Sequence, residues 1–192
     1  MADDQMTHDD MTEALRDLTA RVTALEDRAA IAALMTTYGP AIDAGDADAV
    51  AQVWTEDGEY DVDTGVMRGH DEIRAMVRGP MHQGFVRGGC AHILEPGHVV
   101  VDGDTAVATG KSLLVTADGP GGPFTVVRAT ANRWELVRVD GRWRCRRRVA
   151  RLLDGRPEAR ALLADEIAVE VAGGVAGEVA GEAAGGVVGS SH

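Results

Sequence analysis

Four stretches rich in strand-forming residues decide the fold of this chain: AHILEPGHVVV at 91–101, TAVATGKSLLVT at 105–116, FTVVRATANRWELVRV at 124–139 and RWRCRRRVARLL at 142–153. The short linkers between them consist mostly of Asp, Gly and Pro, the residues that form hairpin turns. Strands joined by such turns pair with their neighbours. We therefore expect a meander of antiparallel strands in the second half of the chain.

The first half carries helical patterns instead. Apolar residues recur from Met11 at spacings of three and four, which is typical of one face of an amphipathic helix. Asp27 is predicted to cap the start of a second helix, which Pro40 should bend or end unless the lost hydrogen bond is tolerated there. Ala44-Gly-Asp46 is predicted to end this helix, and Asp46 to cap a short third helix. The apolar faces of these helices comprise Leu15, Leu18, Val22, Leu25, Ile31, Leu34, Met35, Tyr38, Val50, Val53 and Trp54.

A short strand at 59–62 and a further helix after Arg68 lead into the meander. Helices that precede a curled sheet predict an α+β domain with the N-terminal helices packed against a curved, mainly antiparallel sheet. We expect the first helix to pack on its own domain or on a neighbouring subunit, because its apolar stripe covers fewer than three heptads.

The length of 192 residues suits one domain with appendages. We divide the chain into an N-terminal helical extension at 1–26, the α+β domain at 27–165 and a tail at 166–192. The tail repeats Val-Ala-Gly-Gly and Val-Ala-Gly-Glu, a composition too poor in large apolar residues to offset the entropy of ordering. It is therefore predicted to be flexible.

The net charge of −12 excludes several classes of partner. An acidic surface repels nucleic acid backbones and anionic lipid headgroups, so we expect neither nucleic acid nor membrane partners. The start of the chain has no secretory signal pattern, which favours a cytoplasmic protein. Cys90 and Cys145 are interpreted as reduced, buried residues. The histidines show no metal-binding spacing, so neither a metal nor another cofactor is expected.

Asp43 and His92 are the strongest candidates for catalysis. Asp43 ends an N-terminal helix, and His92 opens the first long strand in Gly89-Cys-Ala-His92-Ile-Leu. A carboxylate paired with an imidazole fixes one tautomer of the ring and stabilises its protonated form. The pair is therefore expected to act as an oriented general base, although Asp43 alone is also compatible with an ordinary turn cap and His92 with a buried core histidine.

Several short motifs resemble those of one known family: Tyr38, Ile-Asp43-Ala-Gly-Asp46, Trp54-Thr-Glu-Asp-Gly58, Arg68-Gly-His-Asp-Glu-Ile73 and Asp140-Gly-Arg-Trp143. From about Asp27 to Leu153 the chain resembles the SnoaL-like branch of the nuclear transport factor 2-like superfamily. The resemblance implies a cone-shaped α+β barrel around one deep pocket, and an association into a homodimer or homotrimer. Its members include scytalone dehydratase, bile-acid dehydratases, a dehydrochlorinase, steroid isomerases, polyketide cyclases of secondary metabolism and noncatalytic binding proteins.

The resemblance also implies roles for individual residues. Asp43 and His92 match the catalytic pair of scytalone dehydratase and the dehydrochlorinase-like enzymes, and Asn132 matches a substrate-contacting asparagine. Arg148 looks like the pocket arginine of the dehydrochlorinase. Lys111 stands where scytalone dehydratase has a second histidine, a departure that argues against dehydration of the same substrate.

Strand alternation gives a second view of the substrate-binding candidates. Lys111 shares a face with Val107, Thr109 and Leu113 and is expected to face the interior, where it would place a cation in the pocket or extend to its rim. Asn132 is expected inside the cavity or in a cross-strand hydrogen bond. Tyr38 and Tyr60 are interpreted either as cavity hydroxyls or as core aromatic residues.

Together these features predict a cofactor-independent lyase or isomerase of the dehydratase, double-bond isomerase or polyketide cyclase type, acting on a hydrophobic cyclic small molecule. The alternatives are an epoxide hydrolase of the limonene type, and a noncatalytic ligand-binding or accessory protein, such as the small subunit of a ring-hydroxylating oxygenase.

Overall fold

The computed structural model describes residues 7–95 and 97–164. The predicted tail at 166–192 lies outside the described residues. The elements follow in the order α1 (His8–Asp43), α2 (Ala47–Ala51), β1 (Trp54–Val62), β2 (Gly65–Arg68), α3 (Gly69–Arg78), α4 (Pro80–Gly88), β3 (Cys90–Leu94), β4 (His98–Asp102), β5 (Thr105–Ala117), β6 (Phe124–Val139) and β7 (Arg142–Leu152). Residues 157–164 form a further short helix. Within the described part of the chain, no helix is both long and apolar enough to cross a membrane.

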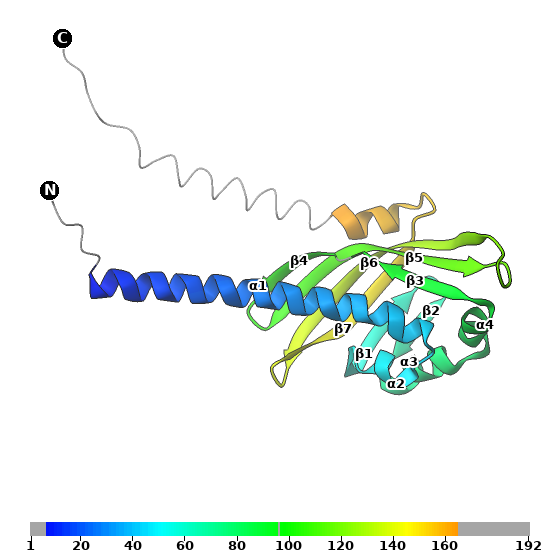
Figure 1. The fold of residues 1–192 in the computed structure, drawn as a ribbon, viewed down its shortest axis with the longest axis horizontal. Coiled ribbons are helices and arrows are strands. Elements are labelled where there is room, and N and C mark those ends of the chain that lie inside the picture. Colours follow the sequence, from blue (N-terminus) through cyan, green and yellow to red (C-terminus); the bar gives the residue numbers. More distant parts are fainter. Residues whose placement is uncertain (1–6, 96, 165–192) are drawn as a thin grey trace, which may run out of the picture.

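One curved, open sheet holds all seven strands in the order β2-β1-β7-β6-β5-β3, and β4 pairs with the part of β5 that β3 leaves free (Figure 1). The predicted meander is confirmed for β5, β6 and β7, which pair antiparallel through the expected turns. The sheet is mixed, however, because β1 runs parallel to β7. The α+β fold with helices against a curved sheet is thus confirmed.

The core lies between α1 and the sheet. Ile31, Met35 and Tyr38 of α1 are buried and belong to the same cluster as Trp134 and Leu136 of β6. The ring of Trp134 contacts Tyr38 edge-on with centroids 6.0 Å apart and stacks on Trp54 at 6.2 Å. These contacts hold the C-terminal half of α1 across the sheet and so fix the position of its last residues.

The predicted helix start at Asp27 is wrong, because α1 is one helix of 36 residues, whereas the predicted end at Ala44-Gly-Asp46 is confirmed. Asp27 does not cap a helix: its buried carboxylate accepts hydrogen bonds from Arg138 at 2.8 Å and from Trp143 Nε1 at 3.1 Å. Pro40 does not end the helix either. Its neighbour Gly39 has no Cβ to clash with the proline ring, so the helix continues to Asp43.

Of the other local predictions, one is confirmed and one is wrong, and one helix was missed. Asp46 caps α2 as predicted, with Oδ1 accepting from the backbone N–H groups of Asp48 and Ala49. The expected single strand at 91–101 is two strands, β3 and β4, which pair with different parts of β5. Helix α4 was not predicted; its sequence PMHQGFVRG begins with proline and contains two glycines, which have low helix propensity.

Candidate active site

Asp43 and His92 lie in direct contact. The Asp43 Oδ1 atom lies 2.6 Å from His92 Nδ1. The same carboxylate accepts the backbone N–H of His92, at 2.8 Å to Oδ2 and 3.1 Å to Oδ1. The aspartate thus binds both the ring and the main chain of its partner, which holds the imidazole in one orientation.

The end of α1 approaches β3 closely at Gly39. A Cβ atom at this position would lie 2.6 Å from the carbonyl oxygen of His92 and 3.3 Å from Leu94 Cδ1. Only a residue without a side chain allows this distance. Gly39 therefore brings Asp43, one helical turn further on, to the strand that carries His92.

The contact with Asp43 determines the tautomer of His92. A carboxylate accepts hydrogen bonds, so Nδ1 carries the proton and Nε2 keeps its lone pair. Burial lowers the pKa of His92 below its usual 6.5, and the hydrogen bond and charge of Asp43 oppose this shift. The imidazole is consequently neutral at pH 7 and able to accept a proton through Nε2.

Cys90 also touches the pair, with its Sγ 3.5 Å from Asp43 Oδ1. Burial and the neighbouring carboxylate raise the pKa of this thiol to about 11, so it stays protonated and donates to Asp43. Asp43, Cys90 and His92 each bring a potential metal ligand within 4.8 Å of the others. They could hold a cation only by giving up the hydrogen bonds that they make to one another.

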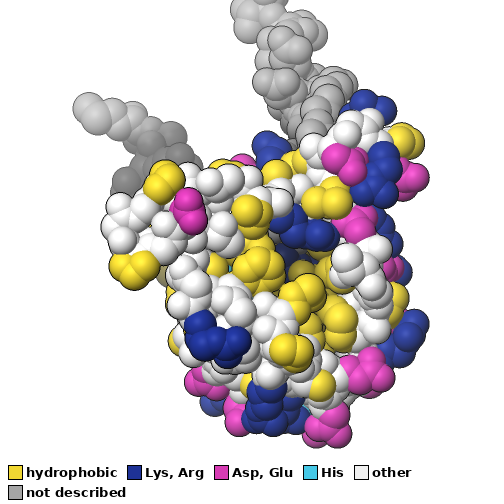
Figure 2. Space-filling view, turned by 90° about the vertical axis from the view of Figure 1, so that its right-hand side faces the viewer, with side chains coloured by type: hydrophobic (Ala, Val, Ile, Leu, Met, Phe, Trp, Pro, Cys, Tyr) yellow, Lys and Arg dark blue, Asp and Glu magenta, His cyan; other side chains and the backbone are white. Residues whose placement is uncertain are grey.

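A cavity of about 460 Å³ opens beside His92, and its lining includes Tyr38, Tyr60, His82 and Arg148. Most of its other lining residues are apolar, among them Ile42, Met67, Met76, Phe85, Leu94 and Leu114. Figure 2 looks onto the right-hand end of Figure 1, where hydrophobic side chains surround a hollow. A mainly apolar pocket with a few convergent polar groups is typical of a small-molecule site.

Arg148 and Asn132 form a buried pair next to this cavity. The Asn132 Oδ1 atom accepts from Arg148 Nε at 3.1 Å and from Nη2 at 2.7 Å. The Asn132 amide in turn donates to Ser112 Oγ at 3.0 Å. Asn132 lies on the inner face of β6 as expected, but it orients Arg148 from behind and does not itself line the cavity.

Tyr38 and Tyr60 line the same cavity from α1 and β1. Burial and the neighbouring Tyr60 raise the pKa of Tyr38 far above its usual 10, while the charge of Arg148 opposes the shift. The Tyr38 hydroxyl therefore stays protonated and keeps its ability to donate a hydrogen bond.

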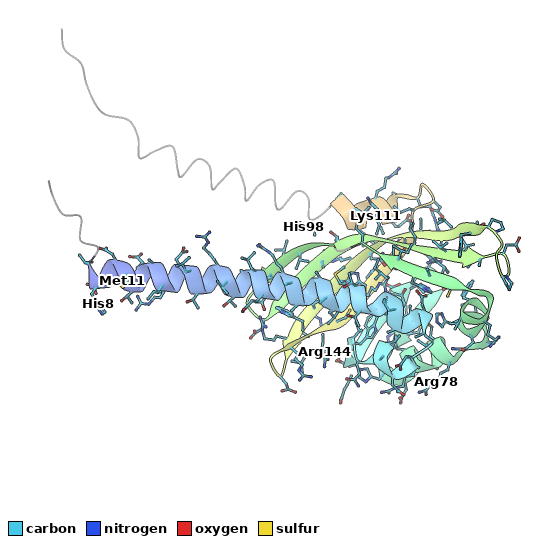
Figure 3. The ribbon with its side chains drawn as sticks, viewed as in Figure 1. His8, Met11, Arg78, His98, Lys111 and Arg144 are labelled. Carbon is cyan, nitrogen blue, oxygen red and sulfur yellow. The ribbon has the colours of Figure 1, made fainter. Side chains whose placement is uncertain are left out.

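Lys111 does not face the interior, and this prediction is wrong. The residue opposite Asn132 on β5 is Gly110, so the inner face carries Gly110, Ser112 and Leu114. Lys111 lies on the other face, and its side chain is exposed (Figure 3). Alternation correctly separates the two faces of a strand but does not say which one is covered.

His82 is the site residue that the sequence patterns did not indicate. It is buried in α4, its Nε2 donates to the carbonyl oxygen of Ile42 at 2.8 Å, and its ring centroid lies 5.7 Å from that of His92. No spacing motif links residues 82 and 92, because different elements bring them together.

Comparison with known proteins agrees with this architecture. A family model described as a SnoaL-like domain matches residues 23–149. An NTF2-like protein with a cystatin-like fold from Novosphingobium aromaticivorans is 43% identical, with a TM-score of 0.74 over 78% of this chain and 96% of that chain. No curated protein matches the chain.

Two further solved structures from the same organism are more distant. A candidate aromatic ring hydroxylase is 29% identical, with a TM-score of 0.56 over 67% of this chain and 90% of that chain. A candidate scytalone dehydratase, at 22% identity, shares the fold with a TM-score of 0.59 over 69% of this chain and 87% of that chain.

Proposed function

Since this chain belongs to the SnoaL-like family of NTF2-like proteins, we propose that it is a cofactor-independent lyase or isomerase that moves a proton on an enolisable, mainly apolar small molecule. The observation that carries the proposal is the contact of 2.6 Å between Asp43 and His92 at the wall of an apolar cavity. Dehydration, double-bond isomerisation and aldol-type cyclisation share this first step.

His92 is the proposed base. Its neutral Nε2 takes a proton from the carbon next to a substrate carbonyl, and the resulting imidazolium is stabilised by the Asp43 carboxylate. The imidazolium then returns the proton to a departing hydroxyl in a dehydration, or to another carbon in an isomerisation. In both cases the protein ends in the protonation state in which it began.

The negative charge that develops on the carbonyl oxygen needs a donor. Tyr38 is the proposed donor, because its hydroxyl stays protonated and it lines the cavity together with His92. The positive charge of Arg148, whose Cζ lies 4.8 Å from the Tyr38 ring centroid, further favours an oxyanion at this end of the cavity. Lys111 has no part in this proposal, since its side chain lies on the outer face.

Epoxide hydrolysis of the limonene type finds less support. That chemistry needs two carboxylates around an arginine to activate water, and no Asp or Glu lines the cavity within the described residues. A noncatalytic binding role is the remaining alternative, and a direct measurement of proton transfer distinguishes it from catalysis.

Proton abstraction is testable before the full reaction is known. The full chain is incubated in D₂O with a panel of cyclic β-hydroxyketones, and deuterium uptake at the carbon next to the carbonyl and formation of the enone are followed by NMR. We expect His92→Ala to lose roughly 10²–10⁴-fold in the exchange rate, the usual contribution of a general base. Asp43→Asn is expected to lose at least about tenfold.

Asp46→Asn is the matched control for Asp43→Asn. Asn caps a helix as well as Asp does, so this variant keeps α2 intact and should retain the wild-type exchange rate. Full exchange by both the His92 and the Asp43 variants would refute the base mechanism. Ligand binding without exchange in the wild-type protein would favour the noncatalytic role.

A further inference from the structure

Among the described residues, Arg148 is a buried cation without an anionic partner. Arg148 is only 3% exposed, and its Nη1 atom has no hydrogen-bond partner among the described residues. The two other nitrogens share one neutral acceptor, Asn132 Oδ1. The rings of Tyr38, Tyr60 and Trp134 surround the guanidinium, with Cζ 4.2–4.9 Å from their centroids.

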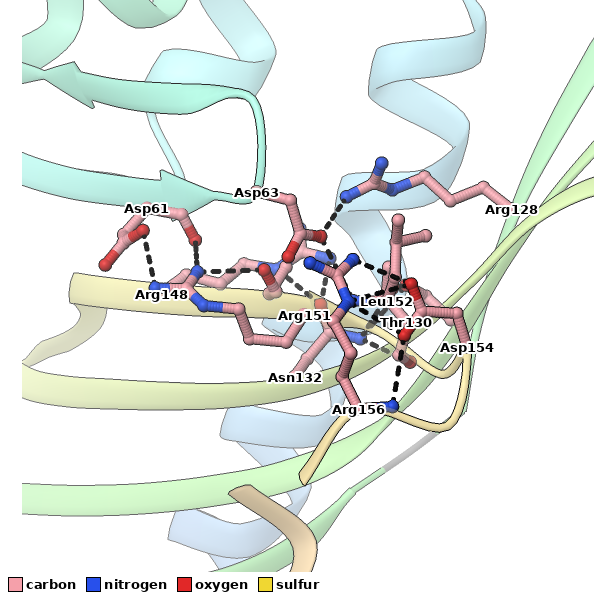
Figure 4. Close-up of polar contacts among 12 residues, drawn as sticks. Asp61, Asp63, Arg128, Thr130, Asn132, Arg148, Arg151, Leu152, Asp154 and Arg156 are labelled. Atoms are coloured by element: carbon pink, nitrogen blue, oxygen red, sulfur yellow. Dashed lines mark hydrogen bonds and ion pairs between the residues drawn. The ribbon is translucent and has the colours of Figure 1, made fainter. Parts of the chain in front are cut away.

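Neighbouring arginines are compensated differently. Arg151 pairs with Asp61 at 2.9 Å, and Arg128 pairs with Asp63 at 2.8 Å (Figure 4). The chain has 31 acidic residues for 19 basic ones, so carboxylates are not scarce. Of the two arginines that line the cavity, Arg128 has a carboxylate partner and Arg148 has none among the described residues.

A buried charge of this kind is unfavourable unless an opposite charge approaches it. Aromatic rings stabilise a guanidinium in part but do not neutralise it. Since Arg148 lines the cavity, a ligand in the cavity is in position to supply the missing negative charge.

We propose that Arg148 binds a carboxylate of the substrate, so that the molecule which enters the cavity is an organic acid. This deepens the proposed function and rests on it: the substrate would be an enolisable ketone that carries a separate carboxylate. The Nη1 and Nη2 edge of a guanidinium matches the two oxygens of a carboxylate. A phosphate dianion fits less well, because the other arginine at the cavity, Arg128, is already paired.

The charge preference is tested by calorimetry on the full chain at pH 8 in a buffer without chloride. The probes are 1-naphthoate and 1-naphthamide, which have similar shapes but differ in charge. We expect the naphthoate to bind at least tenfold more tightly. At this pH both the carboxylate and the guanidinium are ionised, so the difference reports their attraction.

Asn132→Asp is the decisive variant, because it gives Arg148 the carboxylate that it lacks while hardly changing the shape of the pair. We expect it to weaken naphthoate binding at least tenfold and to leave naphthamide binding unchanged. Arg148→Met should do the same if it folds. Undetectable naphthoate binding, equal binding of the two probes by the wild-type protein, or an unchanged preference in Asn132→Asp would overturn the inference.

The same experiment separates this inference from the proposed function. His92→Ala removes the proposed base but not the cation, so it should still bind naphthoate more tightly than naphthamide. If the wild-type protein prefers naphthoate but exchanges no protons, the anion site stands and the proposed catalysis fails. If exchange occurs without a charge preference, the catalysis stands and the anion site fails.

A second, independent observation concerns the start of α1. Its exposed apolar residues are Met11, Leu15, Leu18, Val22 and Leu25, each between 47% and 63% exposed. Their spacings of four and three form a heptad pattern. At about 100° per residue, this stripe lies roughly opposite the face that α1 buries against the sheet.

We infer that a second copy of this chain covers the stripe, in a parallel two-stranded coiled coil. Leu15 and Val22 then occupy a positions, and Met11, Leu18 and Leu25 occupy d positions. Val22 at a between Leu18 and Leu25 at d is the combination that favours two strands. The parallel register also places Arg21 at a g position opposite Glu26 at the e position of the partner helix, which pairs opposite charges. Ala29 and Ala32 continue the stripe at the next a and d positions with small side chains.

Association is tested on the full chain by sedimentation equilibrium. We expect the wild-type protein to be a dimer and Leu18→Glu to be a monomer at the same concentration, while the control Ala20→Glu, on another face of α1, stays dimeric. Arg21→Glu should weaken the dimer, and combining it with Glu26→Arg should restore it. A monomeric wild-type protein, or a Leu18→Glu variant that remains dimeric, would refute this interface; failure of the charge exchange to restore the dimer would refute the parallel register.

Discussion

At the scale of single residues, Asp43 serves the site in two ways. Its carboxylate holds the His92 ring at 2.6 Å and the His92 main chain at 2.8 Å, so the position and the tautomer of the proposed base depend on one side chain. The hydrogen bond and charge of Asp43 raise the pKa of His92, whereas burial lowers it, because burial disfavours the charged imidazolium. The balance between these effects determines the pH at which His92 becomes a base.

This balance predicts the pH dependence of proton abstraction. In the proposed mechanism the neutral imidazole is the active form, so kcat/KM is expected to rise with pH through the pKa of His92 and then to level off. Because burial lowers this pKa below 6.5, we expect more than half of the plateau rate at pH 6.5. Asp43→Asn removes the groups that raise the pKa, and its acid limb should lie at still lower pH although its plateau is lower. Rate profiles from pH 4.5 to 9 check both effects, and an acid limb centred above 6.5 would contradict them.

At the scale of elements, the crossing of α1 over β3 builds the site. Gly39 allows the helix to approach the His92 carbonyl oxygen more closely than any side chain would permit. A helix kept further from the strand would leave the carboxylate of Asp43 short of the imidazole. The geometry of the pair thus depends on a residue that has no chemistry of its own.

Gly39→Ala is therefore expected to damage both the site and the fold. The added Cβ would lie 2.6 Å from a backbone oxygen, so α1 and β3 must separate, at a cost of about 1–3 kcal/mol in the free energy of unfolding. Urea denaturation measures this loss, and deuterium exchange measures the accompanying fall in activity. Gly84→Ala is the matched control: it lies in α4 with nothing within 4 Å of the new Cβ, and should be neutral or more stable by up to about 1 kcal/mol. Equal stability and activity of the two variants would contradict this role of Gly39.

At the scale of the whole molecule, the sequence predicts what local signals encode. The turns that precede Thr105, Phe124 and Arg142 identify the meander, because hairpin partners are neighbours in the chain. The parallel pairing of β1 with β7 has no such signal, since about ninety residues separate Tyr60 from its partner Arg148. The same holds for Asp27, whose local preference for a helix start is overridden by Arg138, 111 residues away.

In the candidate site, too, contacts between residues far apart in the chain have no local signal in the sequence. Asp43 and His92 could be paired in advance because a family resemblance supplied the long-range contact that local patterns lack. Lys111 was assigned to the wrong face, because alternation leaves open which face of a strand is covered. His82 and the unpaired state of Arg148 could not be predicted at all, since both depend on which elements meet around the cavity.

The long first helix also determines where a label or a solid support can be attached to the protein. Its 36 residues span about 54 Å, and it begins at the end of the molecule opposite the hollow seen in Figure 2. A fluorescent reporter or a solid support joined near His8 would thus stand clear of the entrance, and small molecules could still reach His92. Immobilised preparations made in this way should turn over as fast as the free protein.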